Sequence, residues 1–62
     1  MIATLINGAK DGVKMRLADD AYRIEIPVDE SSDIIETETY ALSKFETIGD
    51  TVYADFIMIE AS

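Results

Sequence analysis

Apolar and polar residues alternate along much of this chain, with the period of two that is typical of half-buried β-strands. Residues 2–6 are rich in β-branched side chains, residues 13–17 alternate cleanly, and residues 22–28 alternate again. Turn-forming residues separate these segments, because residues 7–12 contain Asn-Gly and Asp-Gly and residues 18–20 read Ala-Asp-Asp. The pattern therefore predicts three strands joined by two tight connections.

The third of these segments contains Pro27 at an outward-facing position. Because proline has no N–H to donate, this strand should end there or lie at an edge of the sheet. The short link at residues 18–20 favours an antiparallel hairpin between the second and third strands. The solvent face of that hairpin would carry Lys14, Arg16, Arg23 and Glu25.

Residues 34–48 fit two interpretations. As a strand, Leu42 and Phe45 lie on opposite faces, so a β-bulge near residues 43–44 is needed to bring them into phase. As a helix, the segment would have a serine or aspartate cap and a partial apolar stripe, which two threonines and a glutamate interrupt. We favour the strand, together with one short helical turn near residues 31–36.

The last segment, residues 51–60, follows a Gly-Asp turn and is apolar on both faces towards its end. Such a strand is usually central in a sheet or covered by an oligomer contact. The flanks of the turn predict a closing hairpin. The sequence thus predicts one mostly β domain over residues 1–62, with about five strands in an antiparallel meander that forms a small barrel or a half-open sheet.

Size and composition limit the chemistry of the chain, which has 62 residues, no cysteine and no histidine. Disulfides, thiolate metal sites and histidine-activated nucleophiles are therefore excluded. The acidic residues do not have the spacing of an EF-hand, and the Gly-containing loop at 7–12 lacks the Lys-Ser ending of a phosphate-binding loop. We expect no catalytic residue, no metal site and no cofactor.

The hydrophobic fraction of 48% is high enough for a folded core. No apolar run approaches the length of about 18 residues that a membrane span needs, and no signal peptide is evident. We therefore expect a cytoplasmic protein that does not contact a membrane.

Charge is distributed unevenly along the chain, whose net charge is -8. The first 23 residues carry three acids and four cations, whereas the rest of the chain carries ten carboxylates and a single cation, Lys44. Nucleic acid should repel such a chain, so it is not an expected partner. Five of the acids are close together in sequence: Asp29, Glu30, Asp33, Glu36 and Glu38.

Residues 7–12, followed by an alternating strand and the sequence Ile24-Glu25-Ile26-Pro27, resemble small proteins encoded by phages and prophages. Those proteins open with a strand, a Gly-x-x-Asp-Gly loop and further strands, one of which ends in aliphatic-x-aliphatic-Pro. They often close with tyrosine-bearing strands, which here would contain Tyr40 and Tyr53. The resemblance covers the first half of the chain. It implies an all-β fold and a viral gene, and it assigns no activity and no functional residues.

The sequence favours a non-enzymatic domain that binds protein or has a structural role, and that associates with itself. A chain this small cannot bury both faces of every strand, so we expect the last strand to supply the oligomer contact. The residues expected to form that contact are Phe56, Ile57, Met58 and Ile59.

The alternative is an acidic decoy that blocks a nucleic-acid-binding protein of the host, because carboxylates spaced along a strand imitate a phosphate array. In that case the five clustered acids form the interaction surface. If they have no such role, they keep an apolar-rich domain soluble.

Overall fold

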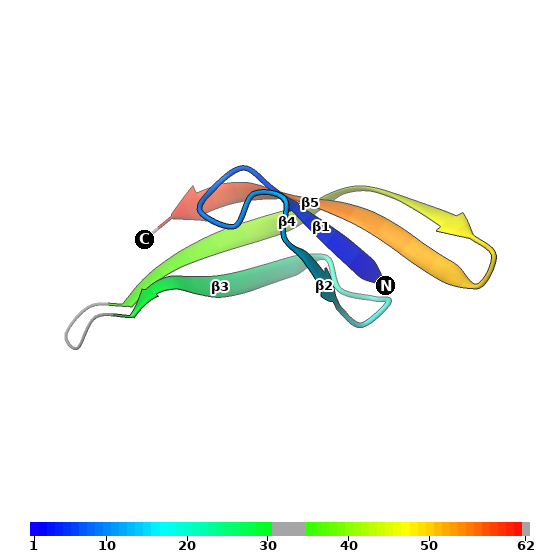
Figure 1. Cartoon of the computed structure of the whole chain (residues 1–62), viewed down its shortest axis with the longest axis horizontal. Helices are drawn as coiled ribbons and strands as arrows, with labels where there is room; N and C mark the ends of the chain where they lie inside the picture. The colour runs from blue at the N-terminus through cyan, green and yellow to red at the C-terminus, as the bar shows by residue number, and fades with distance from the viewer. Residues whose placement is uncertain (31–34, 62) are drawn as a thin grey trace.

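The computed structural model describes residues 1–30 and 35–61, and in this part of the chain it contains five strands and no helix. All five strands belong to one sheet with the order β2-β1-β5-β4-β3 (Figure 1). The all-β class, the five strands and the half-open sheet expected from the sequence are confirmed. The strands are β1 (Ile2–Ile6), β2 (Lys14–Arg16), β3 (Arg23–Glu30), β4 (Ile35–Ile48) and β5 (Thr51–Ala61).

The sheet is mixed, which corrects the expected antiparallel meander. The β1–β2, β3–β4 and β4–β5 pairs are antiparallel, but β1 and β5 run parallel, with Ile2 opposite Tyr53 and Ile6 opposite Ile57. The first and last strands of the chain are therefore neighbours. The predicted loop at residues 7–12 and the closing hairpin at residues 49–50 are both present.

The expected hairpin between the second and third strands is wrong, because β2 and β3 lie at opposite edges of the sheet. The chain between them crosses the open side of the curved sheet, where Leu17 and Ala21 pack against the core. A short link predicts a hairpin only if the sheet is flat. Here the sheet curves, so residues 17–22 are enough to connect β2 at one edge with β3 at the other. The backbone N–H of Leu42 in β4 meets this link at the carbonyl of Tyr22.

The segment that fitted both strand and helix is a strand from Ile35 to Ile48. Its register against β5 shifts between Leu42 and Lys44, which confirms the predicted bulge near residues 43–44. The helical turn expected near residues 31–36 falls on residues 31–34, which lie outside the described residues, and its last two positions belong to β4.

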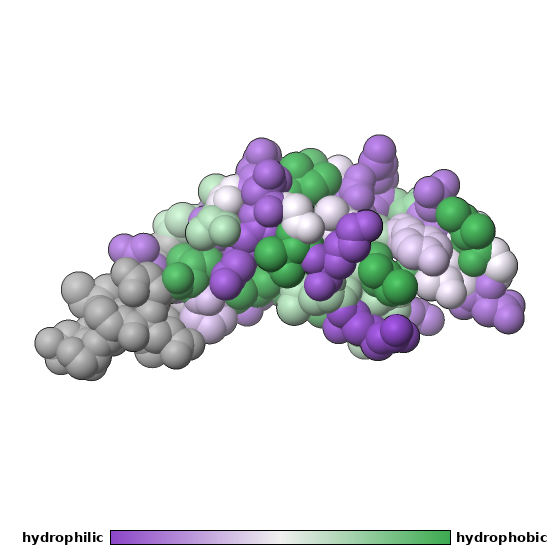
Figure 2. All heavy atoms as spheres, in the orientation of Figure 1, coloured by the Kyte–Doolittle hydropathy of each residue, from purple (hydrophilic) through white to green (hydrophobic). Residues whose placement is uncertain are grey.

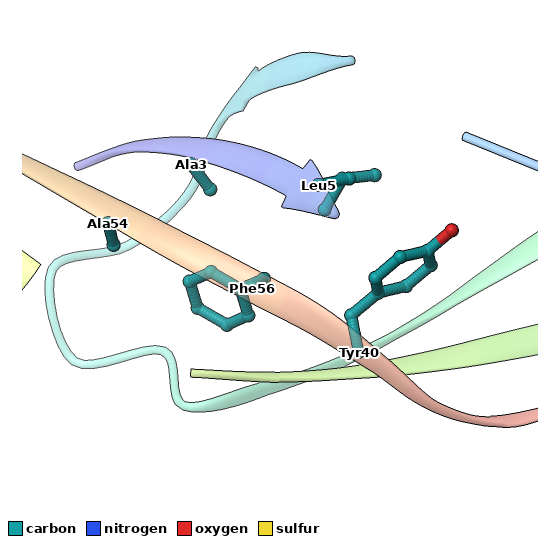
Figure 3. Packing of buried hydrophobic residues seen from close by; sticks show 5 residues of the cluster. All are labelled: Ala3, Leu5, Tyr40, Ala54 and Phe56. Carbon is teal, nitrogen blue, oxygen red and sulfur yellow. The ribbon is translucent and has the colours of Figure 1, made fainter. Parts of the chain in front are cut away.

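The core lies on the concave face where β1 and β5 meet β4. Five side chains from these three strands converge there, as Figure 3 shows: Ala3, Leu5, Tyr40, Ala54 and Phe56. Phe56 and Tyr40 have no exposed surface, and the alanines leave room for them beside the neighbouring backbones. Burying one large apolar side chain contributes about 1.5–3 kcal/mol, so this small set supplies much of the stability of the sheet.

One end of the β4–β5 hairpin extends beyond the other strands (Figure 1). We call this end, residues 43–53, the arm. It closes through a two-residue loop in which Gly49 has a positive φ of 62°. The molecule measures 44 Å along its longest axis and 18 and 17 Å along the others, so the arm lies well outside the core.

The core assignment predicts very different effects for the two phenylalanines of the β4–β5 hairpin. Phe56→Ala should reduce the free energy of unfolding by about 3–5 kcal/mol, because it leaves a cavity in the core. The total for a chain of this size is only about 3–9 kcal/mol, so the variant should be largely unfolded. Phe45→Ala, at a side chain that is 65% exposed, should stay within about 0.5 kcal/mol of the unaltered chain. Urea denaturation at low protein concentration measures both, and similar losses would contradict the assignment.

Candidate functional site

Two side chains of β4 fasten the loop between β1 and β2 to the sheet. Glu38 and Tyr40 are two residues apart and therefore project from the same face of the strand. The carboxylate of Glu38 accepts the backbone N–H of Ala9 at 3.0 Å on one oxygen and 3.1 Å on the other. The Tyr40 hydroxyl donates to Glu38 Oε1 at 2.8 Å and lies 3.3 Å from the carbonyl oxygen of Asn7. The contacts with Ala9 and Asn7 join β4 to a loop that is far away in sequence. The hydrogen bond between Tyr40 and Glu38 aligns the two side chains that make these contacts.

The loop approaches these side chains so closely that only glycine fits at position 8. Asn7 and Gly8 both have positive φ values, of 68° and 72°. A Cβ atom on Gly8 would lie 2.7 Å from both Glu38 Oε1 and the Tyr40 hydroxyl. The Asn-Gly pair that marks a turn in the sequence thus has a second role, which is to let the backbone reach the carboxylate.

Burial raises the pKa of Tyr40 above its usual value of 10.0, and the hydrogen bond to Glu38 adds to this effect. Both make it harder to place a negative charge on the phenol, the first by desolvation and the second because Glu38 stabilises the protonated hydroxyl. The backbone N–H of Lys10 acts in the opposite direction. The pair is therefore arranged to hold a loop.

The acidic segment predicted as an interaction surface is divided by the fold. Glu36 is exposed, whereas Glu38 is 8% exposed and is occupied by its bonds to the loop. Asp29 and Glu30 lie at the end of β3, and Asp33 lies outside the described residues. One of the five acids is thus an internal structural residue, a role that the sequence did not reveal.

The four residues predicted as the oligomer contact are divided in the same way. Phe56 is fully buried in the core, Ile57 and Met58 are half-buried, and only Ile59 is exposed, at 53%. Their alternation along β5 places Phe56 and Met58 on the concave face. The apolar tail of the sequence is therefore mainly core, and Phe56 is not available for contact with another molecule.

Exposed apolar side chains lie instead on the arm. Phe45 is 65% exposed, Ile48 60% and Tyr53 41%. Figure 2 shows a hydrophobic patch at the end of the molecule that the arm forms, next to hydrophilic residues. The bulge places Phe45 opposite Ala54, on the same face as Leu42, so the position of Phe45 beyond the end of the core is what exposes it, and the sequence carries no signal for that.

A groove of about 220 Å³ lies at the base of the arm. Its lining mixes two aromatic residues with charged groups. Lys44 and Asp55 form an ion pair there, at 3.6 Å between Nζ and Oδ2. The residues that line it are Thr4, Lys44, Phe45, Glu46, Tyr53, Ala54 and Asp55.

The structure and the comparisons identify neither a metal centre nor a relative. Within residues 1–30 and 35–61, no three acidic side chains come together in a way that would hold a metal ion. Over the same residues, no helix is long and apolar enough to cross a membrane. Comparison of the chain with models of known protein families, with curated proteins and with solved structures finds no match.

The pKa of Tyr40 predicts a loss of stability in alkali. Above about pH 10 the unfolded chain ionises this phenol while the folded chain keeps it protonated, so the free energy of unfolding should fall as pH rises from there through the folded pKa. Tyr40→Phe removes this contribution. At neutral pH it should cost about 1 kcal/mol, because Glu38 loses a donor, and the difference from the unaltered chain should shrink as pH rises to about 11.

Urea denaturation at neutral and alkaline pH measures this difference. Tyr22→Phe is the matched control, because it removes a phenol that is 73% exposed and should change stability little at either pH. A gap between Tyr40→Phe and the unaltered chain that stays constant across the pH range would contradict the assignment.

Proposed function

We propose that this chain is a non-enzymatic protein-interaction domain that binds its partner through the arm. The observation that carries the proposal is the exposure of Phe45, Ile48 and Tyr53 on the arm. Aromatic residues are enriched at the centres of protein interfaces, and covering apolar surface contributes about 25 cal/mol for each Å² removed from water.

The architecture of the arm adds to this argument. A two-stranded hairpin is marginally stable in water when it stands alone. Beyond the point where β3 begins, the β4 part of the arm has only β5 beside it among the described residues. Phe45 lies on one face of the hairpin, and Ile48 and Tyr53 lie on the other. A partner that encloses this end would order the hairpin and cover these apolar side chains.

Two other features support binding over catalysis. The one cluster of buried polar side chains, Glu38 and Tyr40, holds the loop at residues 7–12. The groove at the base of the arm offers a lysine already paired with an aspartate. The acidic decoy receives less support, because Glu38 is turned inward. Composition and the resemblance to phage proteins favour a cytoplasmic, phage-encoded protein as the setting of the interaction.

Site-specific photo-crosslinking tests the proposal. Phe45 is replaced with p-benzoylphenylalanine, which preserves an aromatic ring at the arm, and the cells that make the protein are irradiated. Discrete adducts with one or a few proteins are expected, because an interface holds its partner close to this side chain.

The control carries the same photoreactive residue at Val13, which is 43% exposed and lies next to β2, at the far edge of the sheet. It should give no discrete adduct. A blank result at Phe45, or the same adducts from both positions, would show that the arm is not the binding surface.

A further inference from the structure

The sheet leaves one edge of the arm available for pairing. The first residue of β3 in register with β4 is Arg23, opposite Ala41, and the contact between the Leu42 N–H and the Tyr22 carbonyl lies one position further on. Residues 43–48 of β4 continue beyond that point, and no strand flanks them on this side within the described part of the chain. All six are exposed.

The edges formed by β2 and β3 have features that discourage pairing. β2 is only three residues long and carries Lys14 and Arg16. In β3 the Tyr22 carbonyl faces β4, so alternation directs the backbone groups of Arg23, Glu25 and Pro27 outward. Proline at an outward position removes a donor from that edge. Short length, charge and proline are the usual means of blocking an edge strand. Residues 43–48 are longer than β2 and contain no proline, and their two charges, Lys44 and Glu46, have opposite signs.

The hairpin geometry fixes which backbone groups of β4 point to the unflanked side. In a two-residue hairpin the residues that flank the loop, here Ile48 and Thr51, form a hydrogen-bonded pair. Alternation then directs the N–H and C=O of Phe45 and Thr47 outward. The Leu42 N–H also points outward, to Tyr22, and the one extra residue at the bulge accounts for the change of phase between Leu42 and Phe45.

We propose that the arm pairs with the arm of a second copy of this chain, antiparallel about a twofold axis at Phe45; the inference rests on the proposed function. In this register the two Phe45 residues form a hydrogen-bonded pair on the axis. Lys44 of each copy then lies opposite Glu46 of the other, twice over. These are non-hydrogen-bonded pairs, in which Cα atoms are about 4.5 Å apart and side chains approach closely.

The charge pattern favours this register over the registers whose axis lies one residue away. Moving the axis to Lys44 would place two lysines opposite each other. Moving the axis to Glu46 would place two glutamates opposite each other, which is destabilising. Centring on Phe45 makes the edge complementary to itself, as a twofold contact requires. Tyr22 and β3 occupy the flank of β4 up to Leu42, so a second copy can pair only along a short stretch around Phe45. A weak dimer is therefore expected.

Charge reversal tests the register directly. Lys44→Glu places acids at both positions 44 and 46, and Glu46→Lys places cations at both. Each variant alone faces like charges across the axis and should dimerise at least about tenfold more weakly than the unaltered chain. An equimolar mixture restores opposite charges at every pair, so a heterodimer should form with about the original affinity.

Sedimentation equilibrium up to about 1 mM chain measures these associations. The matched controls are Lys14→Glu and Glu25→Lys, which change the net charge by the same amounts at exposed positions on β2 and β3. Both should dimerise nearly as the unaltered chain does. Circular dichroism of each variant verifies that the sheet is intact. Because the chain has no cysteine, Phe45→Cys gives a second reading, and it should oxidise to a disulfide dimer where Val13→Cys does not.

The proposal is overturned if the unaltered chain is monomeric throughout the range, if the single reversals associate as strongly as the controls, or if the mixture fails to associate. Photo-crosslinking from Phe45 separates this inference from the proposed function. Adducts with a different protein, in a chain that is monomeric by sedimentation, leave the arm as a binding surface and exclude the second copy as its occupant. The absence of both adducts and dimers rejects the two together.

Discussion

The structure depends on the position of β5 between β1 and β4. This strand is apolar on both faces towards its end, and it is the central strand of the five in the sheet. Its Phe56 and Ala54 form the middle of the core, with β1 contributing Ala3 and Leu5 from one side and β4 contributing Tyr40 from the other. A single sheet of this size has no second layer to pack on, so curvature around this strand is what creates an interior.

Hydrogen bonds hold the loop at residues 7–12, which the small apolar core does not hold in place. The loop at residues 7–12 contains no large apolar side chain, although it lies over the concave face beside Tyr40. Glu38 replaces apolar contact there with hydrogen bonds to the Ala9 N–H and the Tyr40 hydroxyl. No buried side-chain polar atom in the described part of the chain lacks a partner. A domain with few large buried residues tolerates a buried carboxylate only because both of its oxygens accept hydrogen bonds.

Local pattern was sufficient to predict the strands and turns, and insufficient to predict their neighbours. Alternation identified β2 and β3, β-branched residues identified β1, and a run that is apolar on both faces identified β5. The phase slip between Leu42 and Phe45 identified the bulge in β4. The parallel pairing of Ile2 with Tyr53 has no local signal, because it depends on how far the sheet curves. The same lack of a local signal explains why the oligomer contact was predicted at residues 56–59, most of which belong to the core or lie half-buried. Phe56 and Ile59 look alike in sequence, and only the packing of β1 over β5 buries the first and leaves the second exposed.

The parallel pairing of β1 with β5 also constrains when this chain can fold. During synthesis β1 and β2 emerge first, but a two-stranded hairpin of this length is not independently stable. Its other neighbour is the last strand to be made, and loop-closure entropy over nearly the whole chain must be overcome before Ile2 meets Tyr53. We therefore infer that β1 and β2 stay unfolded until β5 has been made, and that folding is slow for a domain so small. A newly made chain thus passes through an interval in which its apolar strands depend on dilution, on the repulsion of its acids, or on a chaperone to remain apart from other chains.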